Sequence, residues 1–115
     1  MRMRPEALKG HLDGLLLAVL ERGPRHGYAI IEAVRAGSGG TFDLQTGTVY
    51  PALHRLERAG YIESHWHVIN GRRRREYRLT AAGLRALSDE RAVWAEFAGA
   101  VSSLLGGQAW PADAS

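Results

Sequence analysis

The stretch that decides the fold is TGTVYPALHRLERAGYIESHWHVINGRRRREYRL, which covers residues 46–79. Residues 46–59 carry apolar side chains at helical spacing. Residues 61–69 and 77–79 are instead rich in β-branched and aromatic residues, which is typical of strands. Asn70-Gly71 lies between them and is a strong signal for a tight hairpin turn. The stretch therefore predicts a helix followed by a β-hairpin.

Helical patterns flank this stretch on both sides. Apolar residues recur at helical spacing over residues 8–20 and again over about 26–36, and residues 80–105 predict one long helix with Thr80 as N-cap. The order is helix, helix, helix, hairpin, long helix. It predicts a mainly α fold with a β-hairpin wing, that is, a winged helix-turn-helix followed by a long C-terminal dimerisation helix.

The expected division of the chain follows this order. Residues 1–79 are predicted to form the winged-helix domain, with its first helix also in a dimer interface, and residues 80–106 the dimerisation helix. Residues 107–115 are expected to be a flexible tail. The last helix is too long to pack wholly on so small a domain, and a second copy of the chain is the simplest surface to cover it.

Chain length and composition exclude several classes of protein and of binding site. The 115 residues suit one domain, and the chain has no cysteine, which excludes disulfides and thiolate metal sites. No apolar run approaches the roughly 20 residues of a membrane helix, and no secretory signal is evident, so we expect a cytoplasmic protein without a membrane partner. No catalytic motif is present, so neither enzyme activity nor a cofactor is predicted.

The helix over residues 46–59 has two different faces. At about 100° per residue, Val49, Leu53 and Leu56 point to one side. The opposite side carries Gly47, Thr48, Pro51, His54, Arg55 and Arg58. Small residues first and long cations later suit a recognition helix in the major groove of DNA, with Thr46 as the expected N-cap. The alternative is a solvated face in which the two arginines pair with Glu57 and Glu63.

The hairpin strengthens the nucleic-acid interpretation. Its tip is predicted to read Gly71-Arg72-Arg73-Arg74-Arg75, with Arg78 close behind and only Glu76 to offset the charge. Such a run of cations repels itself unless an anion lies among them. The expected partner is double-stranded DNA, contacted at the minor groove or along the phosphate backbone. The alternative is a merely soluble loop.

Three motifs in order resemble the PadR family of bacterial transcriptional regulators. Residues 46–62 are similar to the family's recognition helix, residues 71–83 to its wing and the start of its dimerisation helix, and His26-Gly27-Tyr28 to its second-helix motif. The resemblance covers about residues 8–105 and is to the branch with a single C-terminal helix. It implies a homodimeric repressor that binds an inverted-repeat operator and is released by a small molecule.

The resemblance also implies which residues contact DNA. This chain has Gln45-Thr46 where the family often has a Ser-Pro pair, and Gln45 can cap the helix or contact DNA from there. Tyr77 is interpreted as an anchor of the wing strand in the core. The full set of expected DNA-binding residues is Gln45, Thr46, Thr48, Tyr50, His54, Arg55, Arg58, Arg72, Arg73, Arg74 and Arg75.

The last helix carries an apolar seam of the coiled-coil type. Arg91 interrupts the seam, and Phe97 and Leu104 widen it. Its expected partners are the same helix and the first helix of another subunit. The predicted dimer-interface residues are Leu12, Leu16, Leu84, Leu87, Trp94, Ala98, Val101 and Leu105.

Trp94 is also the centre of a predicted effector site. In relatives of the short branch that bind flat drugs, a Trp on this helix faces its symmetry mate, and Trp94 falls at the matching distance after Thr80. This implies a small aromatic effector at Trp94 and Phe97, with Asp13 lining the same cavity. The alternatives are that Trp94 fills the dimer core and that Asp13 is an ordinary exposed acid.

Two other interpretations remain open at this point. His65 and His67 share one face of a strand and could bind metal with His54 or Glu63, but two histidines are too few for us to predict a metal site. By architecture, the chain could be a MarR-type regulator, although that fold normally needs further helices at both ends. A winged helix can also serve as a protein-interaction module, against which the four arginines of the wing argue.

Overall fold

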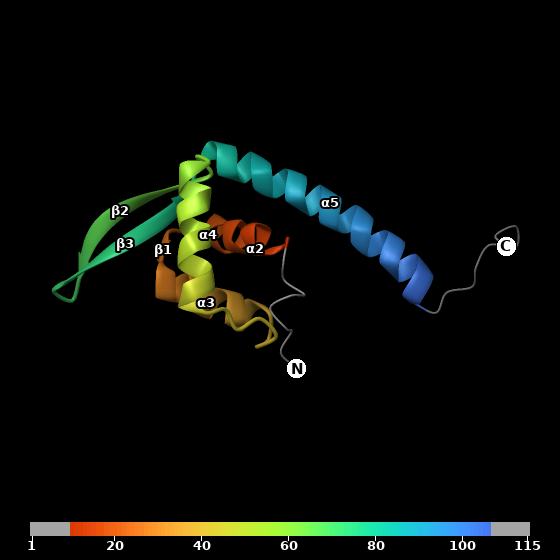
Figure 1. Cartoon of the computed structure of the whole chain (residues 1–115), viewed down its shortest axis with the longest axis horizontal. Coiled ribbons are helices and arrows are strands. Elements are labelled where there is room, and N and C mark those ends of the chain that lie inside the picture. The colour runs from red at the N-terminus through yellow and green to blue at the C-terminus, as the bar shows by residue number, and fades with distance from the viewer. Residues whose placement is uncertain (1–9, 107–115) are drawn as a thin grey trace, which may run out of the picture.

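The computed structural model describes residues 10–106 of the chain. In Figure 1, α4 stands between the β2–β3 hairpin on one side and α2 on the other, and α5 extends away from the rest of the fold. This is the predicted winged helix-turn-helix with a long last helix. The elements are α2 (Leu12–Glu21), β1 (Arg25–His26), α3 (Gly27–Gly37), α4 (Thr46–Arg58), β2 (Ile62–Ile69), β3 (Arg72–Leu79) and α5 (Ala81–Leu105).

The sheet is antiparallel, in the order β1-β3-β2. The short strand β1 was not predicted from the sequence, and it pairs Arg25 with Tyr77 on β3. Asn70 and Gly71 form the hairpin turn with φ values of 51° and 76°, a left-handed conformation that Asn and Gly tolerate best. One prediction was wrong here: the arginine run is not a tip. It is the first half of β3, where its residues pair with Trp66 to Ile69 of β2.

The observed starts of the helices agree only in part with those predicted from the sequence. Thr80 caps α5 as predicted, since its Oγ1 accepts a hydrogen bond from the Gly83 amide at 3.1 Å. Thr46 is not the cap of α4: the capping position belongs to Gln45, whose extended backbone precedes the helix and whose side chain makes no capping hydrogen bond. The first described helix begins at Leu12, and residues 8 and 9 of the predicted helix lie outside the described residues.

The core lies between α2, α3, α4, the base of the hairpin and the first turns of α5. Tyr77 is only 6% exposed within it, which confirms the predicted anchor of β3. Leu16 and Leu87 are also buried, at 0% and 2% exposure, so a single chain already covers these two predicted dimer contacts. The buried residues are Leu16, Leu17, Leu20, Ile30, Val34, Leu44, Val49, Ala52, Leu53, Leu56, Ile62, Tyr77 and Leu87.

Helix α5 packs on α2 along part of its length. Arg91, which interrupts the apolar seam, donates two hydrogen bonds to the Glu21 carboxylate at 2.7 and 3.0 Å. Gly14 leaves room for Glu90, because a Cβ at Gly14 would lie 2.8 Å from the Glu90 Cγ. Farther along, Leu104 and Leu105 are exposed. Within residues 10–106, no helix is long and apolar enough to cross a membrane.

Candidate nucleic-acid interface

A groove of about 430 Å³ lies between the hairpin, the start of α3 and Tyr50 of α4. Its lining includes the four consecutive arginines of β3 together with aromatic residues of α3, α4, β2 and β3. Its charge and its aromatic walls suit the sugar-phosphate backbone of DNA. The lining residues are His26, Gly27, Tyr28, Tyr50, Trp66, Arg72, Arg73, Arg74, Arg75 and Tyr77.

Tyr50 reaches into this groove because Gly27 has no side chain. A Cβ on Gly27 would collide with the Tyr50 hydroxyl, so the Gly of the His-Gly-Tyr motif makes room for the ring. Burial raises the pKa of Tyr50 above its usual value, and Tyr28 adds to the rise while Arg74 opposes it. A Tyr hydroxyl is protonated at neutral pH even at its ordinary pKa, so Tyr50 can donate a hydrogen bond to an anion.

Trp66 organises the arginines on one face of the hairpin. It lies directly opposite Arg75 across β2 and β3, and side chains of opposite residues share a face. The guanidinium carbons of Arg73 and Arg75 lie 4.7 and 5.3 Å from the centre of a Trp66 ring, within the range of cation–π contacts. Trp66 was missed by the sequence reasoning. Counting outward from Asn70-Gly71 would have placed it opposite Arg75.

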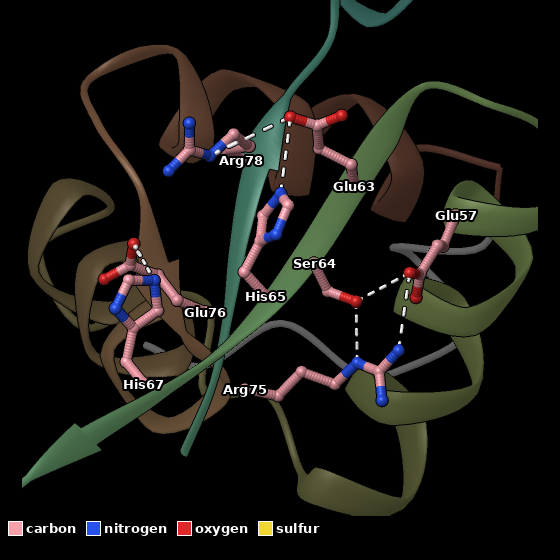
Figure 2. Close-up of polar contacts among 8 residues, drawn as sticks. All are labelled: Glu57, Glu63, Ser64, His65, His67, Arg75, Glu76 and Arg78. Carbon is pink, nitrogen blue, oxygen red and sulfur yellow. Dashed lines mark hydrogen bonds and ion pairs between the residues drawn. The ribbon is translucent and has the colours of Figure 1, made fainter. Parts of the chain in front are cut away.

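Arg75 is held by α4 as well as by Trp66 (Figure 2). Its Nε donates to the Ser64 hydroxyl at 2.6 Å, and that hydroxyl donates to the Glu57 carboxylate at 2.6 Å. The Nη2 atom of Arg75 lies 3.6 Å from the same carboxylate. Arg75 is therefore fixed between the hairpin and α4, unlike Arg72, Arg73 and Arg74, for which no ion pair is found among residues 10–106.

The opposite face of the hairpin carries mixed charges. His65 lies 3.6 Å from Glu63, and Arg78 lies 3.9 Å from the same carboxylate (Figure 2). His67 lies 3.4 Å from Glu76. Among the described residues, no three or more His, Cys, Asp or Glu side chains are grouped to hold a metal ion. Each of these two histidines therefore lies beside a carboxylate.

The outward face of α4 is exposed, but one of its cations is already bonded to another helix. Gln45, Thr46, Thr48, His54 and Arg58 are all exposed at the surface. Arg55 instead bonds to Asp13 on α2, with its Nη2 2.5 Å from the Asp13 Oδ1. The structure therefore brings together one residue predicted for DNA and another predicted for an effector cavity.

The predicted dimer and effector residues on α5 divide into two groups. On α5, Leu84, Trp94 and Leu105 are exposed, whereas Ala98 and Val101 are half-buried, as is Leu12 on α2. Trp94 is 52% exposed, and its ring lies 5.4 Å from the ring of His11 on an edge-to-face approach and 5.7 Å from that of Phe97. These apolar side chains form an open surface on a single chain.

Known proteins are similar to this chain in sequence and in fold. The family described as "Transcriptional regulator PadR-like family" matches residues 16–89. The chain is 41% identical over 84 residues to the transcriptional regulator Rv3488 of Mycobacterium tuberculosis; the match covers 73% of this chain but only 63% of that relative's length.

Solved structures agree with this match. A PadR family transcriptional regulator from Eggerthella lenta has a TM-score of 0.76 at 34% identity, over 90% of this chain and 88% of the other. A transcriptional regulator from Clostridium thermocellum has a TM-score of 0.80 at 26% identity, over 87% of this chain and 98% of the other. The family match decides between the PadR and MarR alternatives, and the chain belongs to the PadR-like family of transcriptional regulators.

Proposed function

We propose that the protein is a homodimeric DNA-binding repressor that acts on an inverted-repeat operator in the bacterial cytoplasm. The observation that carries the proposal is the groove beside the hairpin, where four arginines, Tyr50 and Trp66 surround a space of about 430 Å³. An accumulation of cations that surrounds an open groove favours an extended polyanion.

The two parts of the interface have different tasks in this proposal. The exposed first turn of α4, with Thr46 and Thr48, enters the major groove, where short side chains allow close approach to base edges. Arg72, Arg73 and Arg74 bind phosphates or the adjacent minor groove. Arg58 lies in the last turn of α4 and contacts the phosphate backbone of the DNA.

Dimerisation gives the protein a two-fold symmetry that matches the symmetry of an inverted-repeat operator. Exposed Leu84, Trp94, Phe97, Leu104 and Leu105 leave an apolar surface on α5 that a second copy of the helix can cover. A two-fold axis through such an interface presents two recognition helices in opposite directions, which suits two inverted half-sites.

The experiment is selection of bound sequences from random duplex DNA, followed by titration of the selected duplex at several salt concentrations. We expect an inverted repeat whose half-sites lie about one helical turn apart. The log–log salt slope should be roughly −0.9 for each phosphate contacted. An absence of enriched sequences, or binding independent of salt, would contradict DNA binding. A reporter gene behind the operator tests repression, which requires lower expression when the protein is present.

A second proposal concerns release from DNA by a planar aromatic effector. The observation that favours it is Trp94, which is half exposed on the same surface as Phe97 and contacts His11. Two such rings across a two-fold axis can hold a flat ligand by offset stacking. The ligand releases DNA only if it binds the free dimer more tightly than the DNA-bound dimer.

A further inference from the structure

The recognition helix and the wing must keep a fixed relative position if both are to contact one duplex. They are joined by a short connection at residues 59–61, and the hairpin extends well beyond it (Figure 1). A thin two-stranded hairpin is only marginally stable by itself, so its outer half needs support from a neighbouring element. Contacts between α4 and the middle of the hairpin therefore matter for the shape of the interface.

We propose that Glu57 is a positioning residue that clamps the wing to the recognition helix through Ser64 and Arg75. The inference rests on the proposed DNA binding and adds a residue that touches no DNA. The Glu57 carboxylate accepts from Ser64 at 2.6 Å, and it lies 3.6 Å from Nη2 of Arg75 (Figure 2). The clamp therefore joins α4 to both strands of the hairpin.

The clamp also extends to a side chain that faces the groove. Arg75 lies over Trp66, and the other cation over Trp66 is Arg73. A continuous set of contacts thus runs from Glu57 through Arg75 and Trp66 to Arg73. Because the Glu57 and Arg75 side chains are only 30% and 43% exposed, solvent screens this pair less than a fully exposed one.

Simple electrostatics and the clamp predict opposite changes in DNA affinity when the Glu57 charge is removed. Removal of a carboxylate from a surface that binds a polyanion should raise DNA affinity, and it should free Arg75 to contact a phosphate. If Glu57 positions the wing, its removal should instead lower the affinity. The sign of the change therefore separates the two views.

The first test compares Glu57→Gln with Glu63→Gln on the selected operator at several salt concentrations. The two changes remove the same charge, but Glu63 lies on the opposite face of the hairpin, at 3.6 and 3.9 Å from His65 and Arg78. We expect Glu57→Gln to bind about three- to tenfold more weakly than wild type, with no steeper salt slope. Glu63→Gln should bind as well as wild type or better. Equal or tighter binding by Glu57→Gln would overturn the clamp.

The second test is a double-mutant cycle. Arg75→Ala should weaken binding by a similar factor without reducing the salt slope, because Arg75 is engaged by Glu57 and not by a phosphate. The double variant Glu57→Gln/Arg75→Ala should be no weaker than either single variant, since both changes break the same contact. A slope reduced by about one in Arg75→Ala, or additive losses in the double variant, would assign Arg75 to DNA and refute the clamp.

A third measurement needs no DNA. In a Trp94→Phe/Trp110→Phe background, Trp66 is the only fluorescent Trp, and acrylamide reports its exposure to solvent. We expect faster quenching in Glu57→Gln than in Glu63→Gln, with unchanged far-UV circular dichroism. Identical quenching would overturn the clamp. Failure of wild type to bind any duplex would instead refute the proposed function, and the fluorescence result would still decide on the clamp.

Discussion

Arg55 on α4 donates a hydrogen bond to Asp13 on α2, with 2.5 Å between Nη2 and Oδ1. The two residues are 42 positions apart, and both side chains are about half exposed. The bond directs Arg55 toward α2, which packs against α4. It also places a charged side chain of α2 in contact with the element that we propose reads DNA.

The Arg55 contact predicts how two cations of α4 differ. Arg55→Ala should leave the salt slope of operator binding unchanged, because its guanidinium is already bonded to a carboxylate. Arg58→Ala should reduce the slope by about one if Arg58 contacts a phosphate. Titrations of labelled duplex at several salt concentrations measure both slopes. A slope that falls in Arg55→Ala would mean that Arg55 leaves Asp13 on binding DNA.

The wing arginines should act without regard to sequence. Arg73→Ala and Arg74→Ala are each expected to weaken binding to operator and to unrelated duplex by a similar factor, with a slope lower by about one. Arg85→Ala is a suitable control, because it removes an exposed cation from α5 instead of the hairpin. Wild-type affinity in both hairpin variants would refute the wing as a DNA-binding element.

The outer part of α5 should be needed for dimers but not for the fold. Leu105 is 82% exposed and Val101 half-buried, so Val101→Glu/Leu105→Glu should yield folded monomers. Charges cost little on an exposed helix but much in an apolar interface. Ser103→Glu, on the opposite side of the helix, should remain dimeric. Light scattering at micromolar concentration gives the masses, and a monomeric wild type would contradict the proposed dimer.

Trp94 should be dispensable for folding. A fully buried Trp changed to Ala costs about 3–5 kcal/mol, whereas Trp94 is 52% exposed, so the loss should be well below that range. Trp94→Ala should still bind the operator but lose its response to planar cationic dyes. The assay is dye quenching of Trp fluorescence in a Trp110→Phe background, with Trp66→Phe as control. An unfolded Trp94→Ala chain and no quenching by any dye would assign Trp94 to the structure alone.

The Glu21–Arg91 pair should make stability depend on acid pH. Hydrogen bonds from Arg91 lower the pKa of Glu21 from its ordinary 4.5. A folded pKa below the unfolded one stabilises the fold above pH 4.5, and this contribution is lost as the pH falls through the folded pKa. Glu21→Gln should therefore melt lower than wild type at pH 7, with a difference that shrinks below pH 4.5. A difference that stays constant with pH would contradict this.

The sequence by itself determined the elements that depend on local signals. Asn70-Gly71 adopts left-handed backbone and closes the hairpin, and Thr80 caps α5, because turns and caps involve residues only a few positions apart. The apolar period of residues 46–59 likewise placed Val49, Leu53 and Leu56 on the buried face of α4. The order of these elements was enough to predict a winged helix.

Only the tertiary structure decided how the charged and apolar side chains are used. The partners of Arg55 and Arg75 come from other elements, Asp13 on α2 and Glu57 on α4, and such pairing depends on how those elements pack. Periodicity placed Leu87 on the same stripe as Leu105, yet one is buried and the other exposed, because α2 covers only part of α5. A sequence period defines which residues share a face; the packing of distant segments determines what covers it.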